Sequence, residues 1–261
     1  MRSVTSILTA DTDTDSDTDD SYLRYQLQLS GVYVVVCAYR SILPRIDLER
    51  YCLFDTSWSN VFLGRSAATI AEICFAGQIA LLLNKLGEIH GHPIVQMTSY
   101  TIVPAITIAQ ACCWYGILTL NFLAHAIEET IWAVMSAVVG LLLSTFIIFG
   151  TVDAQVWYLS VGGIAAITLY VYFMMKVDVP MYIEKWRTST RLGKELMSIR
   201  IGRQDAWSRR VVTKEWKHWE PEVAWLTGYF SCAVWTSIAL VHLSFDGDSG
   251  AGIVQEQLMN V

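Results

Sequence analysis

A single carboxylate, Glu72, interrupts the apolar run AATIAEICFAG seven residues after Arg65. An ionisable side chain within an apolar segment is costly to keep there and indicates a function by default. We therefore predict that Glu72 is a catalytic carboxylate, or the ion-binding group of a transporter. The structural alternative is a carboxylate that pairs with Arg65 or Arg40 and holds neighbouring helices together.

A second group of ionisable residues is the sequence His125-Ala-Ile-Glu128-Glu129. On a helix, His125 shares one face with Glu128 at i+3 and Glu129 at i+4. Imidazole and carboxylate groups together bind Zn or non-haem Fe, and carboxylates also serve as general acids and bases. We predict His125, Glu128 and Glu129 as metal ligands, with Glu128 and Glu129 also catalytic. The alternative is that these acids only stabilise the N-terminus of a helix.

The third group is His218-Trp-Glu220-Pro221-Glu222, just before an apolar segment. We predict His218 as a further ligand of a divalent metal such as Zn or Fe. A proline followed by an acid is also typical of the first turn of a helix, which is the structural alternative.

Four more residues are candidates for substrate binding. Arg40 and Arg65 have the guanidinium groups that bind phosphate or carboxylate. Asp178 and Tyr182, in KVDVPMYIEKW, follow another apolar segment. The sequence contains no H-E-x-x-H, G-x-S-x-G, Walker or dinucleotide-binding pattern, so it indicates no particular reaction.

The composition indicates the kind of protein that must position these residues. Of 261 residues, 54% are hydrophobic and 16% charged, against about 25% charged in soluble domains. The net charge of −6 argues against a nucleic-acid partner. The fold class that we predict is an all-α, polytopic membrane helical bundle.

Six segments approach the roughly 20 apolar residues that a membrane span needs. The first has the shortest apolar core, and the third and fourth are joined so closely that they must form a helical hairpin. The predicted spans are residues 27–43, 66–84, 97–120, 125–149, 154–176 and 223–244.

The basic residues orient these spans. Residues 40–65 contain four and residues 176–222 contain eleven, which makes fifteen of the eighteen in the chain. With six spans, both regions fall on one side, which the positive-inside rule makes cytoplasmic. Both termini are then outside, and spans two, four and six each bring carboxylates to their cytoplasmic ends. These groups are expected to meet in a polar chamber.

The predicted domain organisation follows from the same features. Residues 1–24, which include the run DTDTDSDTDD, form an acidic disordered tail, and residues 246–261 form a short C-terminal tail. Residues 25–245 form the transmembrane domain. Within it, residues 177–222 form a cytoplasmic interfacial segment, expected as amphipathic helices on the membrane surface or as a solvated loop packed on the bundle.

Three functions remain open from the sequence. The first is a membrane-embedded enzyme that acts on a lipid or other hydrophobic substrate in the chamber. The second is a transporter or channel for ions or small solutes that uses Glu72. The third is a structural or assembly subunit of a membrane complex. The expected partners are membrane lipids and a second copy of the chain or other subunits of such a complex.

Overall fold

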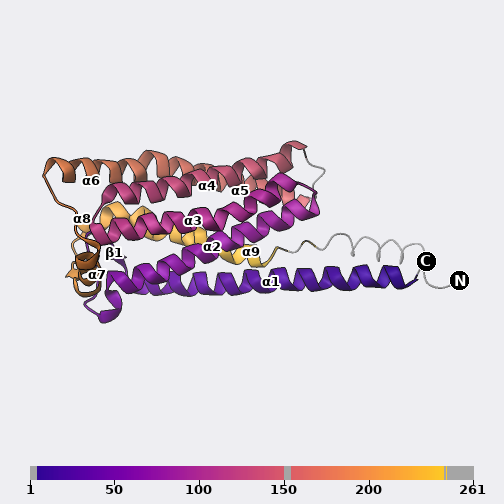
Figure 1. The fold of residues 1–261 in the computed structure, drawn as a ribbon, viewed down its shortest axis with the longest axis horizontal. Helices are drawn as coiled ribbons and strands as arrows, with labels where there is room; N and C mark the ends of the chain where they lie inside the picture. The colour runs from indigo at the N-terminus through magenta and orange to yellow at the C-terminus, as the bar shows by residue number, and fades with distance from the viewer. Residues whose placement is uncertain (1–4, 150–153, 244, 246–261) are drawn as a thin grey trace.

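The computed structural model describes residues 5–149, 154–243 and 245, apart from the side chains of residues 5–20, 149, 155, 224, 225 and 229. Long helices lie side by side along one axis (Figure 1). They are α1 (Thr5–Ile42), α2 (Val61–Ile89), α3 (Pro93–Thr119), α4 (Phe122–Phe149), α5 (Ala154–Phe173), α6 (Val179–Arg191) and α9 (Phe230–Val241). Two π-helical segments, Met174–Asp178 and Ala224–Tyr229, precede α6 and α9.

The span count differs from the expected six. Within the described residues, α2, α3, α4 and the continuous helix Val156–Arg191 are long and apolar enough to cross a membrane. A pair of helices bent by 63°, Trp216–Glu222 and Leu226–Val241, would add a fifth span. An all-α chain with four or five membrane-length apolar helices is therefore confirmed, whereas a sixth span is not.

The segment 27–43, expected as the first span, lies in α1 except for its last residue, and α1 is not one of these membrane-length apolar helices. Its apolar residues are interrupted by Gln28, Ser30 and Arg40. The backbone of the acidic run at residues 11–20 also belongs to α1. The disorder expected for residues 1–24 stays a prediction, and the C-terminal tail at 246–261 lies outside the described residues.

Buried polar side chains join α1 to the bundle. The Gln26 amide donates to the backbone carbonyl of Gln78 at 3.0 Å, and the Gln78 amide donates to the Gln26 side-chain oxygen at 3.1 Å. The Ser237 hydroxyl on α9 donates to the same Gln78 side chain at 2.6 Å. Such interhelical hydrogen bonds replace the hydrophobic driving force that helices lack in lipid. The polar residues that interrupt α1 therefore connect it to α2 and α9.

A two-residue turn joins α3 to α4 and confirms the predicted helical hairpin. Leu120 has a left-handed backbone with φ of 58°, and the Asn121 side chain accepts a hydrogen bond from the Leu123 amide at the start of α4. A Cβ atom on Gly116 would lie 3.0 Å from the Asn121 carbonyl oxygen and 3.3 Å from the His125 amide nitrogen. A glycine there lets the first turn of α4 approach the last turns of α3.

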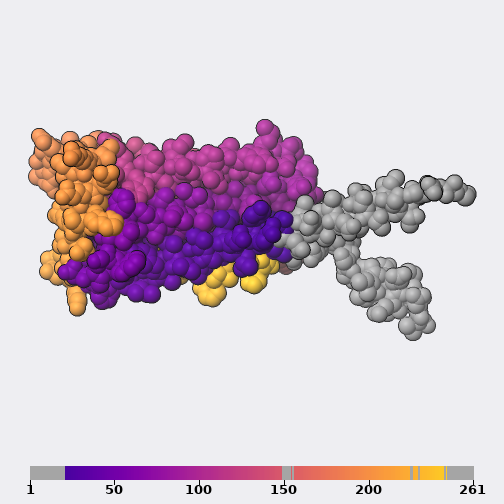
Figure 2. Space-filling view, turned by 60° about the horizontal axis from the view of Figure 1, so that its bottom comes forward, coloured from indigo at the N-terminus to yellow at the C-terminus, as the bar shows by residue number. Residues whose placement is uncertain are grey.

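The chain segments 43–60 and 192–222 cover one end of the bundle, and we call them the end cap. In Figure 2 the orange surface of the second segment meets purple residues of the first. A small sheet joins them, because β2 (Tyr51–Cys52) pairs with β1 (Arg45–Ile46) in antiparallel and with β3 (Val211–Val212) in parallel. The two basic regions of the sequence thus lie at the same end of the molecule.

The segment 177–222 is not one interfacial element. Residues 177–191 continue the fifth helix through its π-helical turn as far as Arg191. The remainder folds back on the bundle in the end cap, with α7 (Ile199–Ser208) and α8 (Trp216–Trp219). The amide of Met197 donates to the carbonyl of Thr119 at the end of α3. Ile201 and Trp207 on α7 remain exposed, as contact with a membrane surface would need.

Candidate functional site

A polar cavity of about 80 Å³ lies inside the bundle next to the end cap. It has room for a few waters, an ion or a small polar group, since one water takes about 30 Å³ in the liquid. Helices α1, α2, α4, α5, α6 and α9 contribute to its lining, together with β1 and both π-helical segments. Eight of the nine predicted site residues line it: Arg40, Arg65, Glu72, His125, Glu128, Glu129, Asp178 and Tyr182.

The ninth predicted residue, His218, is elsewhere. It lies on α8 in the end cap, where its Nδ1 is 2.9 Å from the Thr213 hydroxyl and its ring lies 4.6 Å from the ring of Tyr51. The structure does not bring His218 together with the other predicted metal ligands, because the chain folds over the end of the bundle before α9 begins.

Glu72 takes part in a buried network with α3. An Arg65 Nη2 lies 2.9 Å from Glu72 Oε1 and also donates to the Gln110 side-chain oxygen. The Gln110 amide donates to the other Glu72 oxygen at 2.5 Å, and the Thr69 hydroxyl donates to Gln110. These contacts fit the alternative in which Glu72 pairs with Arg65. The network holds the Arg65 guanidinium between α2, α3 and α4.

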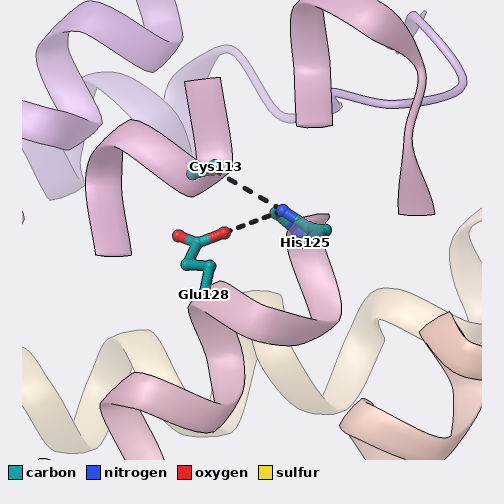
Figure 3. Close-up of side chains that lie close together, drawn as sticks. All are labelled: Cys113, His125 and Glu128. Atoms are coloured by element: carbon teal, nitrogen blue, oxygen red, sulfur yellow. Dashed lines mark hydrogen bonds and ion pairs between the residues drawn. The ribbon is translucent and has the colours of Figure 1, made fainter. Parts of the chain in front are cut away.

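Three side chains from α3 and α4 converge next to this network (Figure 3). The Cys113 Sγ lies 3.6 Å from His125 Nδ1, and Glu128 Oε2 lies 2.7 Å from the same nitrogen. The other Glu128 oxygen lies 3.6 Å from Arg65 Nη2. All three side chains are buried. The shared face of His125 and Glu128 was predicted, and the contribution of Cys113 was not.

The second nitrogen of His125 faces the carboxylate of Glu129. Its Nε2 lies 3.9 Å from Glu129 Oε1, and the edge of the Tyr182 ring packs against the imidazole at 4.5 Å between ring centroids. The Oε2 atom of Glu129 is buried without a hydrogen bond, and the buried Oε2 of Glu128 has only its contact with His125 Nδ1. Buried oxygens of this kind need a water, a proton or a cation in the space that they face.

Arg45 also lines the cavity, although the sequence reasoning gave it no role. Its guanidinium is 3.2 Å from Asp47 and donates to the Asn60 carbonyl at the start of α2. A Cβ on Gly64 would overlap this guanidinium, so the glycine makes space for it. Arg45 lies 19 residues before Gly64 in a polar connection, so no local pattern in the sequence could have revealed this contact.

The charges around the cavity do not balance. Three guanidinium groups, of Arg40, Arg45 and Arg65, line it, against seven carboxyl groups. Asp47 and Glu72 pair with two of these arginines, and Glu49 pairs with Lys185 at 2.9 Å. Of the other four carboxyl groups, Glu128 and Glu129 contact His125, and Glu128 has a longer contact with Arg65. Asp178 and Glu222 form no ion pair among the residues that the structure describes. A buried excess of negative charge favours the binding of protons or a cation.

An apolar cavity of about 440 Å³ lies further along the bundle. Small-molecule sites range from about 300 to 1,000 Å³. Its lining comes from α2, α3, α4, α5 and α9, and Trp132 and Tyr170 line both this cavity and the polar one. In the described part of the chain, α4 packs on α5, and α1 packs on α9. Helices α5 and α9 both line the cavity but do not pack closely on each other.

No known protein family, curated protein or solved structure matches the chain. The two adjoining cavities and the residues around them are therefore the basis for a functional conclusion.

Proposed function

We propose that the protein is a membrane-embedded enzyme that acts on an amphiphilic, lipid-like substrate. The observation that carries this proposal is the pair of cavities that meet at Trp132 and Tyr170, one polar and one apolar. The polar group of a lipid would enter the first and its apolar part the second. A lipid would reach both from the bilayer between α5 and α9, where the helices do not pack closely.

The polar cavity contains groups that suit acid–base chemistry. Glu129 has one buried oxygen without a hydrogen bond, and its other oxygen faces His125. It can therefore take or give a proton inside the cavity, which is the role of a general acid or base. Glu128 is held by His125, and Glu72 is held by Arg65. In this proposal these two carboxylates position their partners and balance their charge.

Arg40 is the group that we assign to the substrate head. Its guanidinium lies over the ring of Phe230 at 5.0 Å, and among the residues that the structure describes no carboxylate pairs with it. A guanidinium without a carboxylate partner can bind a phosphate or carboxylate oxygen of a substrate. Arg65, also predicted for substrate binding, is occupied by Glu72 and Gln110.

Transport of ions by Glu72 has less support from these contacts. Both Glu72 oxygens are already engaged, by Arg65 and by Gln110. A role as an assembly subunit does not account for a buried cavity with an excess of carboxylates. In the proposed orientation, the end cap with the basic residues lies in the cytoplasm.

The test is lipid turnover by the purified protein. We expect nanodiscs made with a natural total lipid extract to lose one lipid class over time, as measured by mass spectrometry. Substitution Glu129→Gln should lower the rate by about 100-fold or more, since a general acid or base contributes about 10²–10⁴-fold. The control is Glu88→Gln, an exposed carboxylate at the opposite end of α2. Unchanged lipids with the parent protein, or full activity of Glu129→Gln, would overturn the proposal.

A further inference from the structure

We infer that Cys113, His125 and Glu128 bind a divalent transition-metal ion, with Zn²⁺ as the ion that fits best. This inference goes beyond the proposed function, because binding of the ion requires no lipid substrate. One ligand atom from each residue lies within 4.8 Å of the other two. Cys113 and Glu128 are at least nine-tenths buried, and the His125 side chain is 11% exposed.

The spacing of the three atoms fits a tetrahedral ion. Ligand distances of about 2.3 Å for sulfur and about 2.0 Å for nitrogen and oxygen place sulfur and nitrogen about 3.5 Å apart, and nitrogen and oxygen about 3.3 Å apart. The Cys113–His125 separation is 3.6 Å, and the His125–Glu128 separation is 2.7 Å. Binding would therefore need the Glu128 oxygen to move outward by about 0.6 Å, which a side-chain rotation supplies.

The arrangement around His125 favours a metal over a cysteine nucleophile. In a nucleophile–histidine–carboxylate triad, the nucleophile and the carboxylate contact opposite nitrogens of the ring. Here the Cys113 sulfur and the closer Glu128 oxygen both approach Nδ1, and the carboxylate at the opposite nitrogen, Glu129, is 3.9 Å away, beyond hydrogen-bond distance. A cation placed between these two donors and the ring nitrogen would bind all three atoms and balance the negative charge of the donors.

The donor types favour zinc over calcium or magnesium. A thiolate and an imidazole are ligands of Zn²⁺ and other late transition metals, whereas Ca²⁺ and Mg²⁺ bind oxygen. The buried Oε2 of Glu128 contacts only His125 Nδ1, so an ion placed between the two would replace that contact. The other Glu128 oxygen faces Arg65, whose charge is already balanced by Glu72. Glu129 faces the second nitrogen of His125, as carboxylates next to metal-bound histidines often do.

The fold brings these ligands together before any metal binds. Cys113 lies in the last two turns of α3, and His125 lies in the first turn of α4, on the two sides of the hairpin turn. Gly116 permits their close approach, since a side chain there would meet the His125 backbone. With three protein ligands, the fourth position remains for a water in the polar cavity, which is the pattern of catalytic rather than structural zinc sites.

The experiment measures metal binding directly, with ZnCl₂ and CoCl₂ as probes. After chelation, the purified protein in detergent should take up one Zn²⁺ per chain, as determined by elemental mass spectrometry. Added Co²⁺ should produce the near-ultraviolet absorption of a thiolate–cobalt bond. This absorption shows whether a cysteine binds the ion in the unaltered protein, so the result does not depend on whether a variant folds.

Matched variants locate the site. Cys113→Ser and His125→Gln should lose the bound ion, whereas Cys112→Ser, at the neighbouring half-buried cysteine, and His218→Gln, in the end cap, should retain it. Glu129→Gln should weaken Zn²⁺ binding by about 10–100-fold, since it removes the partner of the second ring nitrogen.

Three results would overturn the inference: no zinc above the chelated background, no thiolate–cobalt absorption, or equal zinc content in Cys113→Ser and Cys112→Ser. A protein that binds zinc and leaves all lipids unchanged would support the metal site and contradict the proposed function. The two proposals can thus fail separately.

Discussion

The guanidinium of Arg50 and the carboxylate of Asp205, 155 residues apart in the chain, form an ion pair of 2.9 Å in the end cap. The same guanidinium donates to the carbonyl of Ile117 in the last turn of α3 at 2.9 Å and to the carbonyl of Asp47 at 2.7 Å. Arg50 is almost fully buried. One side chain therefore joins the loop after α1, the C-terminus of α3 and helix α7.

We expect Arg50→Ala to lower the free energy of unfolding by about 3–5 kcal/mol, because it removes a buried guanidinium that holds a helix terminus and leaves the largely buried Asp205 with only an exposed contact. The measurement is thermal or denaturant unfolding of the purified protein in detergent. The control is Arg209→Ala, which removes an exposed contact of 3.8 Å to the same Asp205. Exposed pairs contribute about 0–1 kcal/mol. Equal losses in the two variants would contradict the role of Arg50.

Glu72→Gln should destabilise the bundle, because the longer contact to Glu128 is then the only carboxylate contact of the buried Arg65 guanidinium. An unsatisfied buried group costs about 1–3 kcal/mol. In a double-mutant cycle with Arg65→Gln, the two losses should not add, and a coupling of about 0.5–3 kcal/mol is expected. Unchanged stability of Glu72→Gln, together with loss of cation flux in proteoliposomes, would instead support the transporter interpretation.

Gly162→Leu should block the apolar cavity without unfolding the protein. Gly162 lines that cavity, and a Cβ built there meets no atom within 4 Å. Replacing a helical glycine also gains up to about 1 kcal/mol of helix stability. We expect a loss of lipid turnover and of co-purified lipid at an unchanged or higher melting temperature. Gly31→Leu is the control, since Gly31 in α1 also has open space around it and lines neither cavity. Full activity of Gly162→Leu would argue against this cavity as the substrate site.

The orientation of the bundle can be tested with two exposed positions at its opposite ends, Arg203 on α7 and Glu88 on α2. With the basic end cap in the cytoplasm, a membrane-impermeant maleimide applied from the cytoplasmic side of sealed vesicles should label Arg203→Cys and not Glu88→Cys. The unaltered protein provides the background from its own six cysteines. The opposite labelling pattern would reverse the assigned sides.

The sequence alone determined the class of protein and the depth of its polar residues. Composition and segment length established an all-α chain with membrane-length helices, and the short connection at residues 120–121 required the α3–α4 hairpin. Each helical residue adds about 1.5 Å along the axis. The positions of Glu72, His125 and Asp178 relative to the ends of their helices therefore placed them at one level, where the polar cavity lies.

Only the tertiary structure decided which residues meet at that level. Rotation of a helix about its axis, and the choice of its neighbours, come from packing against other helices and not from its own periodicity. For this reason Cys113 joins His125 and Glu128, while His218 remains in the end cap with Thr213. The folding of residues 192–222 over the end of the bundle likewise depends on distant contacts such as Arg50 with Asp205. Local sequence patterns do not predict such contacts, because nothing near Arg50 or Asp205 in the sequence distinguishes it from other charged residues.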